Sequence, residues 1–405
     1  MPRVRTRPIL AALALATCTD TPPPITELTV DTLADGSVVV SNPLHGLWDA
    51  DPGTRWRLVE SLRIGSAVEG GPDAFANVIS LTVDPLDRMW IADSRANEVR
   101  VFDRGGRFVR TIGRSGEGPG EFMAIRGVLR GPNGEMWAAD HGLDRYEIFD
   151  TAGVRIGGQP FPTRGGGSWR DGIYLASDWS EDSDRDVYRV YRPGAAGGLE
   201  PDGRVFELPE DPPDPPRIEF TQGGAGWLLA APFSPRRWRV AGRDLDLWWS
   251  DGRDHGGRYE LRHIDLENGG TLRRVLRQYE TAPISDDVRM AAVQAQLESV
   301  RHDRNLPGVR SPPPEAMSAV PRVYPPFESF HLSGDGTLWV HRSLGDGIDG
   351  FDVFDREGRY LGQPEVPAGL VNMSVRLITA GRMYVIDSDE LGTDYVVRLE
   401  IVRPS

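Results

Sequence analysis

Lysine is absent from this chain of 405 residues, and all 46 of its cationic residues are arginine. The absence excludes two kinds of chemistry, because a Schiff base needs a lysine amine and the Walker phosphate loop needs a lysine beside its glycines. Acidic residues outnumber basic ones, and the formal net charge is −14. Since nucleic-acid binding depends on positive charge against phosphate, we expect no nucleic-acid partner.

Cysteine occurs once, at Cys18, which excludes an internal disulfide and a zinc cluster built from cysteines. The seven histidines contain no HxH or HExxH spacing, and no GxSxG nucleophile elbow is present. The sequence therefore contains no motif of a zinc enzyme or of an α/β-hydrolase.

Long apolar runs are also missing, since spanning a bilayer takes about 20 residues. The first 18 residues instead have the layout of an export signal. A basic start at residues 3–7 precedes a short apolar run at 9–16 and a small-residue site that ends at Cys18. Residues 19–26 are polar and rich in proline, which predicts a stiff tether after the signal.

The tetrapeptide Leu15-Ala16-Thr17-Cys18 resembles the lipobox of bacterial lipoproteins, in which the cysteine thiol is lipidated. It departs from the lipobox at Thr17, where Gly, Ala or Ser is usual, and the alternative is an ordinary secretory signal. The resemblance implies a periplasm-facing protein held on the membrane by its lipid anchor alone. Because Thr19 replaces the aspartate of the inner-membrane retention signal, we expect the outer membrane.

Two stretches of the chain repeat one another. Residues 89–113 and 136–157 align with Trp90 and Trp137 in register, at an offset of 47 residues. A repeat of this length, made of strands and turns, is typical of radially arrayed β-sheets. Weaker copies follow, and the pattern predicts an all-β, six-bladed β-propeller over residues 27–403.

The ring needs a means of closure, because the sixth copy lacks an outer strand. Two early segments, Gly36 to Ser41 and Trp56 to Ile64, have the alternating pattern of strands. We expect both to complete the final blade, which would remove exposed sheet edges.

The segment from Ile112 to Phe122 is the most specific motif in the chain. It reads I-G-R-S-G-E-G-P-G-E-F and resembles the link between NHL repeats, which are β-propeller repeats. The resemblance implies a fold shared with exported bacterial six-bladed propellers, not a reaction. The aspartates of the repeat are predicted to accept hydrogen bonds at turns; they are Asp93, Asp103, Asp140, Asp150 and Asp355.

One segment departs from the β pattern. Residues 284–304 begin with a capping serine, Ser285, and repeat apolar residues at helical spacing. They predict a helical insertion, packed on the side of blade four or five, or lying over one mouth of the channel as a lid or docking element. Residues 209–216, rich in proline and acid, predict an extended surface loop.

The central channel is the expected place for a small-molecule site. Counting back from the second-strand aromatic, by ten residues in each copy and by eleven in copy two, aligns one channel position per blade. These candidate ligand-binding positions are Ser80, Arg126, Arg164, Trp238, Ser329 and Ser374. Two arginines and a tryptophan suit an anionic or sugar-like ligand, and a water-filled channel without a ligand is the alternative.

The sequence leaves the activity open between three classes. The first is an envelope-anchored binding or scaffold propeller that recognises a protein, a peptide or a polar small molecule through one face or its channel. The second is a metal-dependent hydrolase or lyase, for which Glu328, Asn77, Asn372 and His331 lie near the aligned ring; calcium is the metal considered, and no cofactor is predicted. The third is a purely structural envelope component.

Overall fold

The computed structural model describes residues 23–404, except for 69, 164–166, 171–172, 183–184, 195–197, 208–214, 223–224, 243–244, 305–313, 346–347, 371–372 and 390. The predicted signal, Cys18 and the first part of the tether lie outside the described residues, as does most of the connector at 209–216. Among the described helices, none combines the length and the apolar character needed to cross a membrane.

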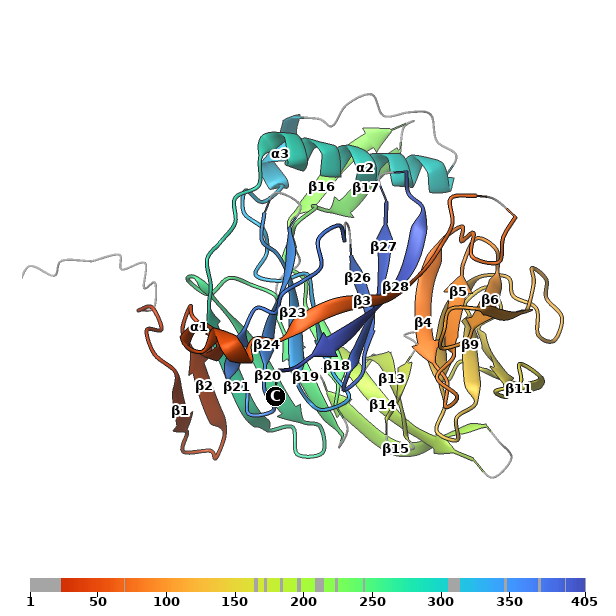
Figure 1. The fold of residues 1–405 in the computed structure, drawn as a ribbon, viewed down its shortest axis with the longest axis horizontal. Coiled ribbons are helices and arrows are strands. Elements are labelled where there is room, and N and C mark those ends of the chain that lie inside the picture. Colours follow the sequence, from red (N-terminus) through yellow and green to blue (C-terminus); the bar gives the residue numbers. More distant parts are fainter. Residues whose placement is uncertain are drawn as a thin grey trace, which may run out of the picture.

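Apart from the hairpin of β16 (Arg217–Gln222) and β17 (Ala225–Ala230), the described strands form a ring of six sheets, the six-bladed β-propeller that the repeats predict (Figure 1). Blades 1 to 3 follow one another along the chain as β4 (Val78–Val83), β5 (Met89–Asp93), β6 (Glu98–Phe102) and β7 (Phe108–Ile112); β8 (Ile125–Arg130), β9 (Met136–Asp140), β10 (Arg145–Phe149) and β11 (Arg155–Pro160); β12 (Gly167–Arg170), β13 (Ile173–Ser180), β14 (Arg185–Pro193) and β15 (Leu199–Glu207).

Blades 4 and 6 recruit strands from the N-terminal segment, whereas blade 5 does not. Blade 4 comprises β18 (Trp238–Ala241), β19 (Asp246–Ser250), β20 (Arg258–Asp265) and β21 (Thr271–Gln278), and it is extended by β2 (Val38–Asn42) and β1 (Thr29–Thr32). Blade 5 comprises β22 (Ser329–Leu332), β23 (Leu338–Ser343), β24 (Asp349–Phe354) and β25 (Tyr360–Gly362). Blade 6 comprises β26 (Ser374–Ile378), β27 (Arg382–Ser388), β28 (Asp394–Val402) and β3 (Arg57–Ile64). Neighbouring strands are antiparallel except for β2 and β21. The first strand of each blade lies innermost, since β4 contacts β8 and β26, and β22 contacts β18 and β26.

The aromatic residues of the repeat occupy corresponding places. Trp90, Trp137, Trp339 and Tyr384 each lie in the second strand of a blade, paired with both neighbouring strands. All four are at most 4% exposed. A separate buried cluster fills each of the six gaps between neighbouring blades, so the ring is closed by side-chain packing as well as by strands.

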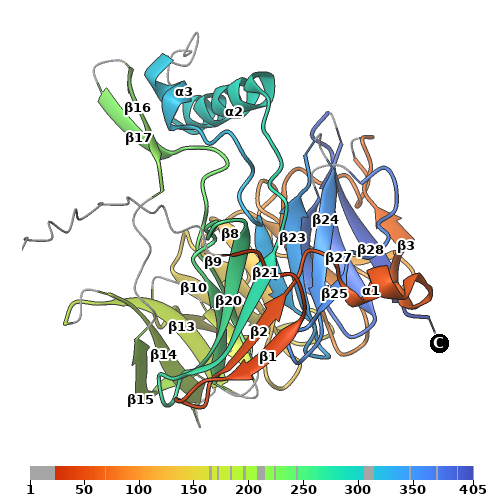
Figure 2. The same ribbon diagram turned by 90° about the vertical axis from the view of Figure 1, so that its left-hand side faces the viewer.

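The ring closes through its two ends. Strand β3 pairs antiparallel with β28, the last strand of the chain, and becomes the outer strand of blade 6 (Figure 2). This confirms the prediction for Trp56 to Ile64. The prediction for Gly36 to Ser41 was wrong, because β2 pairs in parallel with β21 and extends blade 4 instead.

Asn42 explains why the early strand stays at blade 4. Its side-chain amide donates to the carbonyls of Leu276 in blade 4 and Gly358 in blade 5, at 3.1 and 3.0 Å. Its side-chain oxygen accepts from the backbone N–H of Tyr360 at 2.7 Å. Since Asn42 is fully buried, these three bonds join the early segment to two blades, and blade 6 needs only β3.

The link between blades 1 and 2 is shaped by Gly113 and Phe122. Phe122 is fully buried in the cluster between these blades. A side chain at Gly113 would come within 2.1 Å of the Phe122 ring, and the backbone there has φ +80°. Glu121 accepts from Gly118 N–H and pairs with Arg114, which holds the loop closed.

The aspartates of the repeat are structural, as predicted. At the ends of second strands, Asp93 accepts four backbone N–H groups and Asp140 accepts three. Asp103, Asp150 and Asp355 do the same at turns between the third and fourth strands.

A small cap rises from one face of the ring. It consists of the hairpin β16 (Arg217–Gln222) and β17 (Ala225–Ala230) with the helices α2 (Asp286–Arg304) and α3 (Pro314–Ala319) (Figures 1 and 2). Val293 and Leu297 of α2 pack on Ile218 of the hairpin and Val320 beyond α3. The helix predicted at 284–304 is therefore present, and it packs within the cap instead of on the side of a blade.

Arg289 ties the cap together. Its side chain is almost fully buried and donates to the carbonyls of Met317, Val320 and Pro321, at 2.6, 2.7 and 3.0 Å. The segments that enter and leave the helices pair with each other, since Ile284 N–H donates to Arg322 and Tyr324 N–H donates to Ala282. The cap is thus one packed unit on a short paired neck.

Candidate functional site

A cavity of 810 Å³ lies between the innermost strands and the cap. Blades 1, 4, 5 and 6 supply its floor and walls, and Val288 of α2 and Phe233 and Tyr324 of the neck reach it from the cap side. A cavity of this size is within the range of small-molecule sites. The helix therefore lies at one mouth of the channel, the second of the two placements that its sequence allowed.

Four of the six predicted channel residues meet in this cavity. They are Ser80, Trp238, Ser329 and Ser374, from four different blades. Arg126 is exposed and is not part of the lining. Arg164 lies outside the described residues.

The strand register shows that Arg126 and Arg164 are not the positions equivalent to Ser80 in blades 2 and 3. Ser80 is opposite Ala92, and the corresponding pair in blade 2 is Gly127 opposite Ala139. In blade 3 it is Gly167 opposite Ala176. The turn between β8 and β9 is as long as that between β4 and β5, and the one between β12 and β13 is shorter, so Arg126 and Arg164 were counted into the wrong register.

Charged residues and histidines of blades 5 and 6 also line the cavity. The lining includes His331 and Glu328 next to Ser329, Arg376 next to Ser374, and the pair His341 and Asp349. Glu328 and His331 were noted in the sequence only as nearby metal ligands. Strand alternation could have revealed His331, because residues two apart on a strand face the same side.

His331 is the neutral centre of the site. A hydrogen bond of 3.0 Å joins its Nε2 to the hydroxyl of Ser329. Burial lowers the pKa of His331 to about 4, and the charges of His341 and Arg376 act in the same direction. An imidazole of this pKa is a weak base, so His331 suits hydrogen bonding to a ligand better than proton abstraction from Ser329.

The lowered pKa of His331 predicts that the free energy of unfolding depends on pH. Its pKa is depressed below the unfolded value of about 6.5, so the stability it lends is complete above that pH and is lost as the pH falls toward 4. Between pH 7 and pH 4, this effect lowers the free energy of unfolding of the wild type by up to about 3 kcal/mol, and we expect a His331→Asn variant to lack that decrease. Urea unfolding between pH 7 and 4 measures it, and NMR titration should give a ring signal with a midpoint near 4.

The control for this prediction is His45→Asn, since His45 is exposed. That variant should keep the wild-type slope of unfolding free energy against pH. A His331 signal with a midpoint near 6.5 would contradict the argument.

Acidic groups gather on the blade 5 side of the cavity. Asp349 lies 3.5 Å from Nε2 of the buried His341. Glu328 opens on to the cavity, yet protein surrounds most of it, and this burial raises the pKa of its carboxyl. The charge of Asp349 acts in the same direction, whereas His341 and Arg236 oppose it.

Arg376 lies on the blade 6 side. It occupies a bulge of β26, where the register shifts between Val375 and Leu377. Burial lowers the pKa of its guanidinium, and the charge of Asp394 acts in the opposite direction. Among the described residues, no hydrogen bond or ion pair to its side chain is present, so its donors are available to a ligand.

The cap side of the cavity is aromatic. The rings of Phe233 and Tyr324 meet edge to face at 5.3 Å. Phe233 has φ +59°, which is rare for a bulky residue and is found where the surroundings impose it. On the ring side, the indole of Trp238 donates to the carbonyl of Phe330 at 2.7 Å, which fixes its orientation.

The metal-ligand set considered in the sequence is only partly assembled. Glu328 and His331 line the cavity, Asn77 instead donates to Ser94 at 2.6 Å, and Asn372 lies outside the described residues. Within the described part of the chain, no three His, Cys, Asp or Glu side chains are grouped as metal ligands would be.

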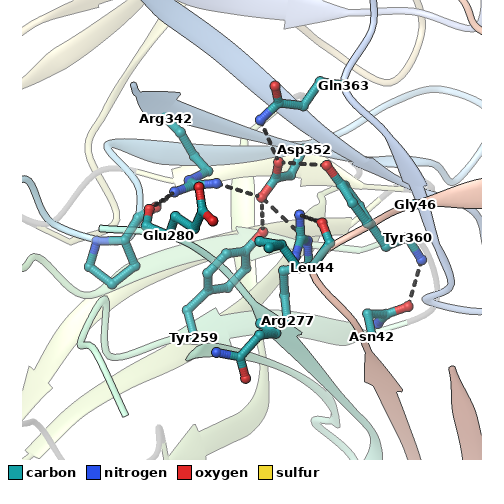
Figure 3. A network of polar contacts seen from close by, with 12 residues as sticks. Asn42, Leu44, Gly46, Tyr259, Arg277, Glu280, Arg342, Asp352, Tyr360 and Gln363 are labelled. Atoms are coloured by element: carbon teal, nitrogen blue, oxygen red, sulfur yellow. Dashed lines mark hydrogen bonds and ion pairs between the residues drawn. The ribbon is translucent and has the colours of Figure 1, made fainter. Parts of the chain in front are cut away.

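A second polar cluster lies apart from the cavity, around Asp352 (Figure 3). This fully buried carboxylate accepts from Tyr259, Tyr360 and Gln363. Arg342 and Arg277 lie 3.3 and 3.7 Å from it.

The two arginines extend this cluster to the segments that leave the ring. Arg277 donates to the carbonyls of Pro43 and Leu44, and Arg342 donates to that of Glu280, before the cap. The cluster therefore fastens the N-terminal segment and the root of the cap to blades 4 and 5.

Comparison with known proteins gives the following matches. The family model described as "6-bladed beta-propeller" matches residues 76–129. A comparison with curated proteins finds no significant match. Among solved structures, the chain is similar to a Bacteroides fragilis protein described as exported, at 12% identity and a TM-score of 0.48, over 90% of this chain and 100% of that one.

Two enzymes are among the other similar structures. One is virginiamycin B lyase from Staphylococcus aureus, at 12% identity and a TM-score of 0.41, over 86% of this chain and 100% of that one. The other is a gluconolactonase from Xanthomonas campestris, at 14% identity and a TM-score of 0.33, over 86% and 95%.

Proposed function

We propose that the protein is an exported binding protein that holds a polar small molecule or short peptide between its ring and its cap. The observation that carries the proposal is the cavity of 810 Å³, in which side chains of four blades and of the cap converge. Hydroxyls, an imidazole, carboxyls and a guanidinium line it together with aromatic rings. This mixture of apolar walls and a few polar groups is characteristic of ligand sites.

The proposal includes the compartment and the repeat type. The lipobox-like tetrapeptide ending at Cys18 supports export and a lipid anchor, and the motif at 112–122 supports the NHL type of repeat. We place the ring on the periplasmic side of the envelope, in the outer membrane. A Cys18→Ser variant should therefore move from the membrane fraction to the soluble fraction without changing its unfolding midpoint.

A hydrolase or lyase is the second candidate, and one observation favours it. Glu328 and His331 both have shifted pKa values in one cavity, as acid and base groups of active sites often do. The size of the His331 shift argues against it as a base, because general bases work best with a pKa near the working pH. Binding therefore accounts for more of the site than catalysis does.

Filling the cavity tests the proposal. Ser374 lines it and forms no hydrogen bond through its hydroxyl among the described residues, so a Ser374→Trp variant should obstruct the site with little other disturbance. We expect protein purified without chelators to carry a small molecule at about one per chain by native mass spectrometry, and the variant to lose it. A saturating ligand at 100 times its Kd should stabilise the wild type by about 2.7 kcal/mol.

The matched control is Thr111→Trp, on the exposed outer strand of blade 1. It adds the same bulk away from the cavity and should keep the ligand. Retention of the molecule by Ser374→Trp would contradict the proposed site. One metal ion per chain in elemental analysis, lost with the ligand, would favour the hydrolase or lyase.

A further inference from the structure

We propose that the cavity recognises a short zwitterionic peptide, with its carboxylate at Arg376 and its ammonium group at Glu328 and Asp349. The inference rests on the proposed binding function and names the class of ligand. It starts from the separation of charge in the cavity, where the guanidinium comes from blade 6 and the carboxyls come from blade 5.

Arg376 is the group that we expect to bind the ligand carboxylate. Its guanidinium makes no hydrogen bond or ion pair with any other described residue, and Arg376 is part of the cavity lining. A planar guanidinium binds a carboxylate through two parallel hydrogen bonds. The Ser374 hydroxyl, also without a partner among the described residues, is two positions away on β26 and can donate to the same group.

Glu328 and Asp349 are the groups that we expect to bind the ligand ammonium group. Glu328 and Asp349 offer carboxylate oxygens, and burial, the main cause of the raised pKa of Glu328, disfavours the charged form of that carboxyl. A ligand ammonium placed there would supply the missing positive charge and three donors. A purely anionic ligand would meet these carboxyls, and a purely cationic one would meet Arg376, so a ligand with both charges fits both walls.

His331 lines the same cavity as Arg376 and the two carboxyls. The charges of Arg376 and of His341, which lies beside Asp349, both lower the pKa of His331. A neutral imidazole has one donor and one acceptor, which matches the alternating N–H and C=O groups of a peptide bond. It can serve a peptide bond between the two charged ends without adding charge of its own.

Size and apolar lining favour a peptide over a single amino acid. The cavity of 810 Å³ approaches the upper end of the range for small-molecule sites, which leaves most of it empty around one amino acid. Trp238, Phe233, Tyr324 and Met373 line it and can bury an apolar side chain of the ligand. A peptide of about two to four residues would satisfy the charged ends and the aromatic wall together.

Calorimetric titration with the tripeptide Ala-Phe-Ala tests the inference on the full ring at pH 7. The free tripeptide should bind, and N-acetylation and C-amidation should each weaken it about tenfold, as the loss of one charged contact does. An Arg376→Gln variant should bind the free tripeptide about tenfold more weakly and become indifferent to amidation. A Glu328→Gln variant should become indifferent to acetylation.

The chain offers a matched control. Arg126 lies at a bulge of the innermost strand of blade 2 and is outside the cavity lining, so Arg126→Gln should leave every affinity unchanged. The groups that face Glu328 are His341, Asp349 and Arg236. Because its pKa is raised, lowering the pH to 5 should weaken the free tripeptide more than the acetylated one.

Equal affinities for the free and blocked tripeptides, or no binding of the free one, would overturn the inference. Its failure can be told apart from that of the proposed function. A co-purified molecule without both charges, lost in Ser374→Trp, would leave the binding function standing and remove the peptide. If neither a co-purified molecule nor the tripeptide binds, both proposals fall.

Discussion

Removal of residues 1–64 is expected to abolish cooperative folding, whereas removal of residues 1–26 is expected to leave the unfolding midpoint unchanged. The longer deletion takes away β3, which pairs with β28 over seven residues. Leu58 and Ile64 of β3 are buried in the clusters on the two sides of blade 6. Loss of each such side chain costs about 2–5 kcal/mol, and total stabilities are about 5–15 kcal/mol.

An intermediate truncation separates the two roles of the N-terminal segment. Removal of residues 1–45 takes away β1 and β2 but spares β3, so blade 6 keeps its fourth strand. We expect this chain to be less stable, because buried Val40 and Asn42 are lost, yet still to unfold in one transition. Urea unfolding followed by circular dichroism compares the three chains. An unchanged midpoint after removal of residues 1–64 would contradict closure by β3.

Replacing Asp352 by asparagine should destabilise the protein by about 3–5 kcal/mol, the usual cost of breaking a buried ion pair from one side. Arg277 and Arg342 would then keep their charges without this counterion, and each is at most 7% exposed in its side chain. The amide nitrogen would also face hydroxyl and N–H donors, of which Tyr259 at 2.8 Å is the nearest.

The effect should depend on pH in a definite direction. Burial raises the pKa of Asp352, but the two arginines outweigh burial and hold it below its ordinary value. A carboxylate with a depressed pKa contributes its stability above the unfolded pKa of about 3.9 and loses it as the pH falls through the folded value. The difference between wild type and variant should therefore be full at pH 7 and shrink below about pH 4.

Asp355→Asn is the matched control, since Asp355 lies three residues after Asp352, directly beyond the end of β24. Its carboxylate accepts the N–H groups of Glu357 and Arg359 at a turn, and its ion-pair partner is 45% exposed. An asparagine oxygen can accept the same bonds, so the loss should stay below about 1 kcal/mol. Equal losses in the two variants, measured by urea unfolding, would contradict the central role of Asp352.

Local patterns in the sequence predicted the parts of this fold that depend on local physics. The second-strand aromatics, the turn aspartates and the helix at 284–304 each follow from a residue type at a fixed spacing, and the structure has all of them. The early strand at Gly36 to Ser41 was misplaced because its pattern shows that it is a strand but not which edge it joins. That choice depends on Asn42 and its partners in two blades, which lie far away in the sequence.

The candidate site was predicted in part for a similar reason. In four blades, a count of ten residues back from the second-strand aromatic reaches equivalent positions of the innermost strand. These residues, Ser80, Trp238, Ser329 and Ser374, meet in one cavity. Blade 2 was misaligned because its turn was taken to be longer than that of blade 1, whereas the two turns have the same length. Blade 3 was misaligned because its turn is shorter, which the residue types there do not reveal. The cap was missed as a unit because its hairpin and its helices are separated by the whole of blade 4.

The pairing of β3 with β28 has a consequence for biogenesis. Strand β3 finds its partner only when the last residues of the chain are available, because the two strands belong to opposite ends of the sequence. Bringing such distant segments together is slow, so a nascent or translocating chain has no closed ring to resist unfolding. During the export that we propose, this arrangement would postpone the native state until the whole polypeptide has crossed the membrane.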